Sequence, residues 1–122
     1  MKKVLIVDDE IINRKLTTSY LLNLGYDEKF ILEAEDGEEA LDILRHQDVD
    51  YVLLDIYMPK MSGLELVDIM KADEKLKDIP VVIVTTDDKL KQVALDRNIN
   101  KFIVRPIDFN DFVKAISEFV IE

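Results

Sequence analysis

The sequence contains no cysteine and no apolar stretch long enough to cross a membrane. The absence of cysteine excludes disulfides and thiolate metal sites, and it favours a reducing, cytoplasmic location. A transmembrane helix needs roughly 20 apolar residues. The first apolar run is stopped by acidic residues after four residues, which is also too short for a signal peptide. We therefore expect neither a membrane span nor a leader.

Positive charge is also scarce, because the 122 residues carry a formal net charge of −10. That balance disfavours direct binding to nucleic acid or to an anionic membrane, both of which require a basic surface. It is compatible with a cation site or a partly basic protein partner, and equally with simple solubility. We see no linker or low-complexity segment. We therefore expect residues 1–122 to form a single domain, either alone or cut from a longer regulator.

Five short apolar runs, rich in valine and isoleucine, are distributed along the chain. They are "KVLIV" (3–7), "FILEA" (30–34), "YVLL" (51–54), "PVVIV" (80–84) and "KFIV" (101–104). They show little alternation between apolar and polar residues, as is typical of strands buried on both faces.

Segments with helical spacing separate these runs. Asp36 with Glu39, and Ser62 with Glu65, have the spacing of a capping box at a helix start. Ile12, Leu16 and Tyr20 indicate a helix that stops at Gly25. Leu90, Val93 and Ala94 indicate a helix capped by Asp87 or Asp88. Phe112, Ile116 and Phe119 indicate a last helix capped by Asp108. A strand followed by a helix, five times over, predicts an α/β fold whose parallel sheet has helices on both faces.

Polar residues follow four of the predicted strands. They are Asp8, Asp9 and Glu10; Asp55; Thr85 and Thr86; and Arg105. In such a sheet, ligands bind outside the carboxyl ends of the strands, so these residues should meet. Clustered carboxylates need a cation, and Mg²⁺ suits one or two carboxylates completed by water and phosphate oxygens. A single aspartate here would usually be a helix cap, so the inference depends on four strand ends converging. After the second strand, Glu33 and Glu35 suggest no chemistry.

The motifs "VLIVDDE", "YVLLDIYMPKMSGLEL", "VVIVTT" and "FIVRPID" resemble the receiver domain of two-component response regulators. The resemblance covers essentially the whole chain, in the right order and spacing. It implies a doubly wound (βα)5 fold of the flavodoxin-like kind, with five parallel strands in the order 2-1-3-4-5. It also implies a phosphorylation-dependent switch in a two-component phosphorelay.

The resemblance assigns a role to each residue at the acidic end of the sheet. Asp55 is implied to be the phosphoacceptor, taking a phosphoryl group from a histidine kinase or a histidine phosphotransfer protein. Asp9 and Asp55 would bind Mg²⁺ directly, Asp8 would bind it through water, and the backbone carbonyl of Tyr57 would add a further oxygen. A metal and a cationic side chain are what phosphoryl transfer requires.

Two further residues match the family's switch. Thr85 stands for the hydroxyl that moves toward the phosphoryl group, and Phe102 for the aromatic that changes rotamer with it. Without the resemblance, both would be ordinary strand residues. The expected output is a change in the face built from the fourth helix, fifth strand and fifth helix, which would bind a downstream target protein.

The chain departs from the family at Arg105, at Thr86 and at "NIN" (98–100), where a Gly-Ala pair is usual. Arg105 replaces the usual lysine; it keeps the positive charge but is bulkier and can bond two oxygens as a fork. It faces either the phosphoryl site or solvent. Thr86 stands where a small residue is usual and could restrict access. Tyr57, two residues after Asp55, can screen the phosphoryl group from water.

Three other functions compete with this one. A pseudo-receiver, acting as a constitutive interaction module, is favoured only by Arg105. A flavodoxin-like cofactor site is rejected because "DDE" after the first strand would repel a phosphate. A haloacid-dehalogenase-type phosphatase needs an acid where Tyr57 stands. The sequence therefore predicts transfer to Asp55 without turnover of a free substrate.

Overall fold

Five parallel strands form one sheet in the order β2-β1-β3-β4-β5. The computed structural model describes residues 1–99 and 101–120. The strands are β1 (Val4–Val7), β2 (Ile31–Ala34), β3 (Tyr51–Asp55), β4 (Val81–Thr85) and β5 (Lys101–Val104). The predicted α/β fold and its strand order are thus confirmed.

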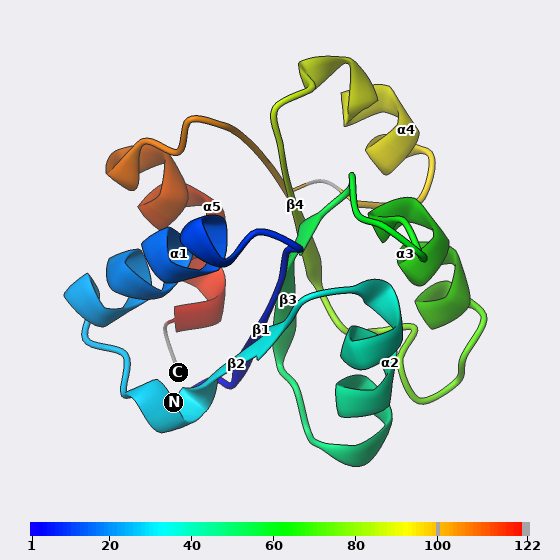
Figure 1. Ribbon diagram of the computed structural model, residues 1–122, viewed down its shortest axis with the longest axis horizontal. Coiled ribbons are helices and arrows are strands. Elements are labelled where there is room, and N and C mark those ends of the chain that lie inside the picture. Colours follow the sequence, from blue (N-terminus) through cyan, green and yellow to red (C-terminus); the bar gives the residue numbers. More distant parts are fainter. Residues whose placement is uncertain (100, 121–122) are drawn as a thin grey trace.

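The helices cover both faces of the sheet, as Figure 1 shows. They are α1 (Ile11–Asn23), α2 (Gly37–His46), α3 (Gly63–Lys71), α4 (Lys91–Leu95) and α5 (Phe109–Val120), with short 3-10 turns η1 (Glu28–Phe30) and η2 (Asp88–Leu90). Helices α1 and α5 pack on one face, and α2, α3 and α4 on the other (Figure 1). Among the described residues, no helix combines the length and hydrophobicity needed to cross a bilayer.

The strands separate the hydrophobic core into two layers. Val4 and Ile6 of β1 belong to the cluster shared with α1 and α5, while Leu5 and Val7 belong to the cluster on the α2–α4 side. This follows from the two-residue period of a strand, whose successive side chains point to opposite faces. Every residue of β1, β3 and β4 is buried, whereas the edge strands β2 and β5 are partly exposed. The lack of alternation in the sequence therefore reflects burial on both faces.

Side-chain caps fix where the crossover helices begin. The Glu39 backbone N–H donates to Asp36 Oδ1 over 2.8 Å, and the Glu65 N–H donates to Ser62 Oγ over 3.2 Å. Both predicted caps are confirmed. Before α4, Asp87 rather than Asp88 provides the cap, and it does so for η2.

Helix α1 ends at Asn23, and Gly25, with a positive φ, is the stop that the sequence predicted. Of the three residues that indicated this helix, Tyr20 packs against the core, whereas the other two are exposed. Ile12 is 76% exposed and Leu16 is 41% exposed, whereas Thr17 and Leu21 are buried. A spacing of four residues identifies one face of a helix, but it does not say which face meets the sheet. Ile12 and Leu16 are therefore available for contacts outside the core.

Gly63 allows α3 to begin directly against the end of β3. A Cβ atom at this position would lie 2.4 Å from the Asp55 carbonyl oxygen and 2.8 Å from Ile56 Cα. Both are backbone atoms that cannot turn away, so any side chain larger than hydrogen would push α3 off the strand. Gly25 offers the contrast, because it has a φ of +96° and a Cβ atom there would meet nothing within 4 Å.

We predict that Gly63→Ala lowers the free energy of unfolding by about 3 kcal/mol because of this overpacking. The matched control is Gly25→Ala, which should cost about 1 kcal/mol through backbone strain alone. Urea unfolding of both variants measures the two effects. An equal or larger loss for Gly25→Ala would contradict the close approach of α3.

Candidate functional site

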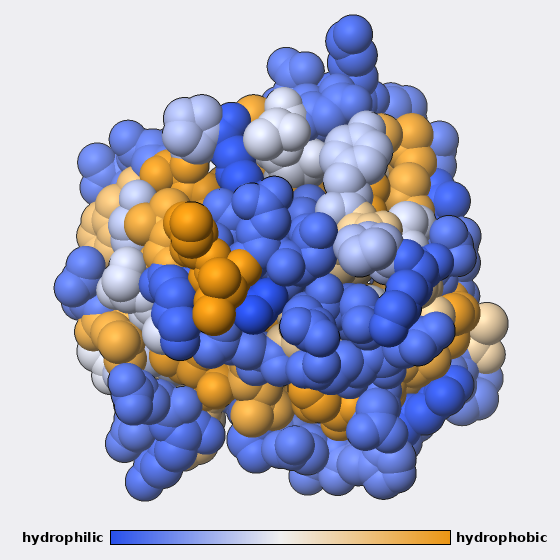
Figure 2. Space-filling model, viewed as in Figure 1, coloured by the Kyte–Doolittle hydropathy of each residue, from blue (hydrophilic) through white to orange (hydrophobic). Residues whose placement is uncertain are grey.

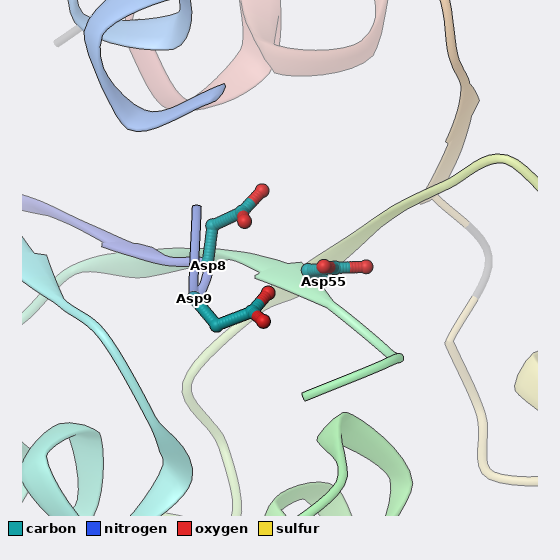
Figure 3. Close-up of side chains that lie close together, drawn as sticks. All are labelled: Asp8, Asp9 and Asp55. Atoms are coloured by element: carbon teal, nitrogen blue, oxygen red, sulfur yellow. The ribbon is translucent and has the colours of Figure 1, made fainter. Parts of the chain in front are cut away.

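Three carboxylates meet at the carboxyl ends of β1 and β3. Asp8 directly follows β1. Asp55 is the last residue of β3, whereas the sequence predicted it to be the first residue after that strand. The two strands are paired, with Val7 opposite Leu54, so the residues after them are brought side by side. One oxygen from each of Asp8, Asp9 and Asp55 lies within 4.8 Å of the others (Figure 3).

Asp8 and Asp55 are buried, with only 2% and 7% of each residue exposed, whereas Asp9 is exposed. Two buried carboxylates side by side repel one another unless a cation lies nearby. Their local backbone also contributes hydrogen bonds. The Glu10 N–H donates to Asp8 Oδ1 over 2.9 Å, and the Tyr57 N–H donates to Asp55 Oδ1 over 3.4 Å.

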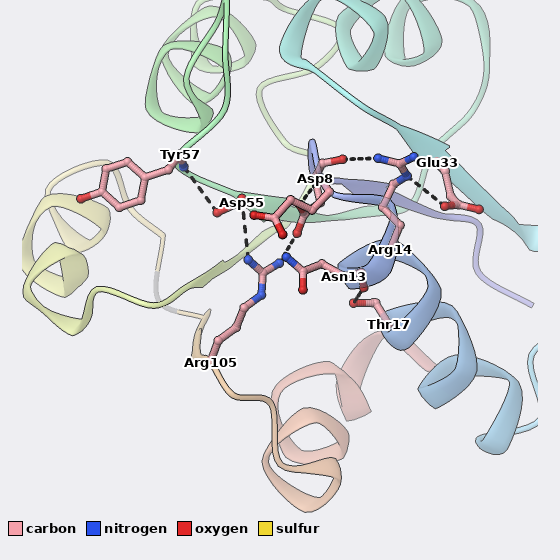
Figure 4. Close-up of polar contacts among 9 residues, drawn as sticks. Asp8, Asn13, Arg14, Thr17, Glu33, Asp55, Tyr57 and Arg105 are labelled. Carbon is pink, nitrogen blue, oxygen red and sulfur yellow. Dashed lines mark hydrogen bonds and ion pairs between the residues drawn. The ribbon is translucent and has the colours of Figure 1, made fainter.

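Arg105 supplies the cation from the end of β5. Its Nη2 donates to Asp8 Oδ2, and its Nη1 lies 3.7 Å from Asp55 Oδ2 (Figure 4). The side chain is only 15% exposed, so it points into the acidic site rather than into solvent. Its backbone N–H also donates to the Thr85 carbonyl over 2.8 Å. Of the two orientations left open for Arg105, the structure has the one facing the carboxylates.

The pKa of Asp55 is raised to about 6, from an ordinary value of 3.8. Burial is the largest cause, and the neighbouring charge of Asp8 adds to it. Arg105 and the Tyr57 N–H act in the opposite direction, but they do not cancel the effect of burial. Asp55 is therefore mostly ionised at neutral pH, but its carboxylate is more basic than that of an exposed aspartate.

The three carboxylates suit a hard divalent cation. Mg²⁺ prefers oxygen ligands and binds through one or two carboxylates while keeping several waters. Asp9 is open to solvent on one side of the cluster, which leaves room for those waters. The donor set therefore fits the magnesium ion that the sequence predicted.

Thr85 and Phe102 lie on the neighbouring strands β4 and β5. Thr85 ends β4 and is fully buried, and the Asp87 N–H donates to its Oγ1 over 3.3 Å. Phe102 pairs with Ile83 and packs against the core, while Lys91 Nζ lies 5.9 Å from the centre of its ring. Thr85 thus lies at the end of β4 that faces the acidic site, and Phe102 lies on β5, the strand that leads to Arg105.

Arg14 is a site residue that the sequence analysis missed. Its Nη1 donates to the Asp8 carbonyl over 2.6 Å, and its Nε donates to Glu33 Oε1 over 3.1 Å (Figure 4). Glu33 had suggested no chemistry, yet it anchors the arginine that fixes the backbone of Asp8. A basic residue in the helix that directly follows the acidic run was the available signal.

Two open cavities lie along β5 and the segment that follows it. The first, of about 490 Å³, lies between α1 and the segment after β5; we call it the α1 cavity, and it is lined by Asn13, Leu16, Tyr20, Thr86, Arg105, Pro106 and Ile107. The second, of about 410 Å³, lies between α4, β5 and α5; we call it the lysine-rimmed groove, and it is lined by Lys91, Lys101, Phe102, Ile103, Val104, Asp111, Lys114 and Ala115. Figure 2 shows an exposed apolar patch over the start of α1, where Ile11 and Ile12 are 58% and 76% exposed.

Comparisons of the sequence and of the fold with known proteins agree with one another. The profile of the response regulator receiver domain matches residues 4–117. A chemotaxis protein CheY homolog of Campylobacter jejuni is 41% identical over 107 residues, which are 85% of this chain and 81% of that protein. Chemotaxis protein CheY-3 of Vibrio cholerae is 39% identical over 106 residues, covering 85% and 80% of the two chains. The solved structure of the chemotaxis response regulator CheY4 of Vibrio cholerae superposes with a TM-score of 0.85 at 29% identity, covering 97% of this chain and 98% of that one.

The raised pKa of Asp55 predicts how its ionisation affects stability. The folded state binds the proton more tightly than the unfolded chain does, so stability falls as the pH rises from about 4 to about 6 and then stays low. In a chelator, Asp55→Asn should therefore be about 3 kcal/mol more stable than the wild type above about pH 7, with no difference below about pH 4.

Urea unfolding at the two pH values measures this difference. Asp9→Asn is the matched control, because it removes an exposed carboxylate from the same cluster and should change stability much less. A wild type that is more stable than Asp55→Asn at high pH would contradict the assignment.

Proposed function

The chain belongs to the family of response regulator receiver domains, so it is a phosphorylation-dependent signalling switch, and we propose that Asp55 is its phosphoacceptor. One observation carries this proposal: the buried carboxylate of Asp55 ends β3 beside Asp8, Asp9 and Arg105. The donor would be a histidine kinase or a histidine phosphotransfer protein. We propose that residues 1–122 act as one receiver domain.

In the transfer step, an oxygen of Asp55 forms a bond to phosphorus while the bond between phosphorus and the donor histidine nitrogen breaks. The electron pair of that bond returns to the imidazole ring, and Asp55 becomes an acyl phosphate. With its pKa near 6, Asp55 is mostly ionised at neutral pH and still more basic than an ordinary aspartate. Tyr57 stands where a phosphatase would carry an acid, so we propose transfer without turnover of a free substrate.

Mg²⁺ would be held directly by Asp9, Asp55 and the Tyr57 carbonyl, and through water by Asp8. When bound, it would neutralise charge on the oxygens of the transferred group. Arg105 would provide the second positive charge, because its guanidinium already lies against the carboxylate that is to be modified. Its two nitrogens would let it contact a phosphoryl oxygen while remaining bonded to Asp8.

The switch would begin at Thr85. Its hydroxyl now accepts from the Asp87 N–H and would turn to donate to a phosphoryl oxygen. Because Thr85 is fully buried, such a movement has to displace neighbouring groups. Phe102, which lines the lysine-rimmed groove, would change position with it. The signal would then emerge on the α4-β5-α5 face.

That face has the chemistry of a docking site for an acidic partner. Lys91, Lys101 and Lys114 surround an apolar floor that includes Phe102 and Val104. Asp111 also lines the groove, and Lys101 pairs with Glu118 over 3.0 Å. The three lysines still outnumber the one acid of the lining, which makes the groove locally basic on a chain of net charge −10. We propose that the downstream target presents acidic and apolar side chains to this groove.

The phosphodonor would approach from the opposite side, over α1. Ile11 and Ile12 form the exposed apolar patch in Figure 2, and Leu16 lines the α1 cavity together with Arg105. An apolar surface that reaches the edge of an acidic site would hold a helical partner while its histidine enters that site.

A constitutive interaction module remains the second candidate, because Arg105 neutralises the acidic pair without any metal. In that case the site would be held permanently in one state. The complete set of Asp8, Asp9, Asp55 and Thr85 at one edge of the sheet favours the switch instead.

We predict that incubation with Mg²⁺ and a small phosphoryl donor adds one phosphoryl group, measured by intact mass. The addition should disappear in Asp55→Asn and be absent when a chelator replaces Mg²⁺. No incorporation by the wild type would favour the constitutive module, and incorporation that persists in Asp55→Asn would overturn Asp55 as the phosphoacceptor. Arg105→Lys should still be phosphorylated, but with an altered phosphoryl lifetime; an unchanged lifetime would remove Arg105 from the switch.

Phosphorylation should also change the amide NMR spectrum of the lysine-rimmed groove. We expect the resonances of Lys91, Phe102 and Val104 to shift, and Thr85→Ala to abolish those shifts while Asp55 is still phosphorylated. The segment around Gly25, at the far edge of the sheet, is the internal control. Shifts confined to the acidic cluster would contradict an output on this face.

A further inference from the structure

Helix α1 contacts the backbone on both sides of the ion pair between Arg105 and Asp8. Arg14 Nη1 donates to the Asp8 carbonyl over 2.6 Å. Further along the helix, the Tyr20 hydroxyl donates over 2.9 Å to the carbonyl of Ile107, which follows Arg105 by two residues. One helix therefore holds the chain next to each partner of the pair, in which Arg105 Nη2 donates to Asp8 Oδ2 (Figure 4).

The segment that joins β5 to α5 has irregular backbone and begins with Arg105. At its start, the Arg105 N–H donates to the Thr85 carbonyl over 2.8 Å. At its other end, Asp108 Oδ1 accepts a hydrogen bond from the backbone of the first turn of α5. Between these two points, the Tyr20 hydroxyl holds the Ile107 carbonyl. The tyrosine thus restrains the part of the segment that directly follows Arg105.

Tyr20 is itself held in place by aromatic packing. Its ring meets the rings of Phe109 and Phe112 edge-on, with centroids 5.3 and 5.5 Å away. It also packs against the core cluster between the sheet and the helices α1 and α5, to which Ile107 belongs. A hydroxyl on a ring fixed in this way can determine the position of the carbonyl that it binds.

The α1 cavity gives the Arg105 side chain room for another orientation. This open cavity of about 490 Å³ is lined by both Arg105 and Tyr20. An arginine side chain has many rotamers, and holding it in one of them costs conformational entropy. A backbone that is fixed beside Arg105 lowers the number of positions from which the guanidinium can turn away from the acidic site.

We propose that Tyr20 is a positioning residue for Arg105: the hydrogen bond from its hydroxyl to the Ile107 carbonyl keeps the guanidinium turned toward the acidic site instead of the α1 cavity. Its effect on phosphoryl uptake rests on the proposed function of Asp55, whereas its effect on the orientation of Arg105 does not. In that function the guanidinium is the cation that meets the incoming phosphoryl group, so a loosened Arg105 slows the transfer.

The orientation is tested in the unphosphorylated, metal-free protein. NMR relaxation measures the order parameter of the Arg105 Nε–H group, whose resonance is identified by its loss in Arg105→Lys. Tyr20→Phe keeps the ring and its aromatic contacts and removes only the donor. We expect the order parameter of Arg105 to fall in this variant from the range of a rigid N–H group to below about 0.6. An unchanged order parameter would overturn the proposal.

Tyr26→Phe is the matched control. The Tyr26 and Tyr51 hydroxyls are hydrogen-bonded over 2.8 Å on the same face of the sheet, but at the start of β3, the end opposite the acidic site. Because both tyrosines are buried, this variant should destabilise the fold at least as much as Tyr20→Phe, yet leave the Arg105 Nε–H group ordered. An equal loss of order in both variants would indicate general loosening of the fold and would overturn the positioning role.

Phosphoryl uptake from the small donor with Mg²⁺ tests the functional consequence. Tyr20→Phe should be phosphorylated about fivefold more slowly than the wild type, the change expected for one lost hydrogen bond, and Tyr26→Phe at the wild-type rate. In an Arg105→Met background, Tyr20→Phe should slow uptake no further, because Tyr20 acts through the guanidinium. A wild-type rate in Tyr20→Phe, or a further slowing in the double variant, would overturn the proposal. If the wild type takes up no phosphoryl group, the proposed function fails, and the order of Arg105 in Tyr20→Phe still decides the role of Tyr20.

Discussion

The fold brings two buried carboxylates into contact, and a single guanidinium makes that arrangement stable. Asp8 and Asp55 are each less than a tenth exposed, and their mutual repulsion contributes to the raised pKa of Asp55. Arg105 reaches both from β5, on the far side of β4. Pairing of β1 with β3 creates the repulsion, and the sheet order then delivers the compensating charge. The site therefore depends on the order of all the central strands, although the acids come from only two of them.

An arginine in this position does more than a lysine could. A lysine carries a compact charge, whereas the two terminal nitrogens of Arg105 address different carboxylates. The backbone N–H of the same residue donates to the Thr85 carbonyl. Any movement of Arg105 toward a new negative charge therefore acts on the end of β4 directly. The departure from the family's lysine preserves the charge and adds a second point of attachment to Asp8.

The sequence predicted what depends on local pattern and strand order. Buried apolar runs gave the five strands, the caps at Asp36 and Ser62 gave two helix starts, and residues after the strands gave Asp8, Asp55 and Arg105. Contacts between distant segments could not be derived in this way. The hydrogen bonds from Arg14 to Glu33 and from Tyr57 to Asp87 depend on how helices and loops pack on the sheet. Spacing alone likewise could not say that Ile12 and Leu16 of α1 face solvent while Tyr20 packs on the core.

The two sides of Asp55 differ in how freely they can adjust. On the α3 side, Gly63 lies against the Asp55 carbonyl with no space for a Cβ, so backbone meets backbone and movement would cause a clash. On the β4 side, Thr85, Asp87 and η2 are joined by hydrogen bonds through side chains, which can exchange partners at small cost. A charge added to Asp55 therefore meets resistance toward α3 and finds replaceable bonds toward α4. Under the proposed function, this asymmetry would direct structural change to the side of the sheet that carries α4, β5 and the lysine-rimmed groove.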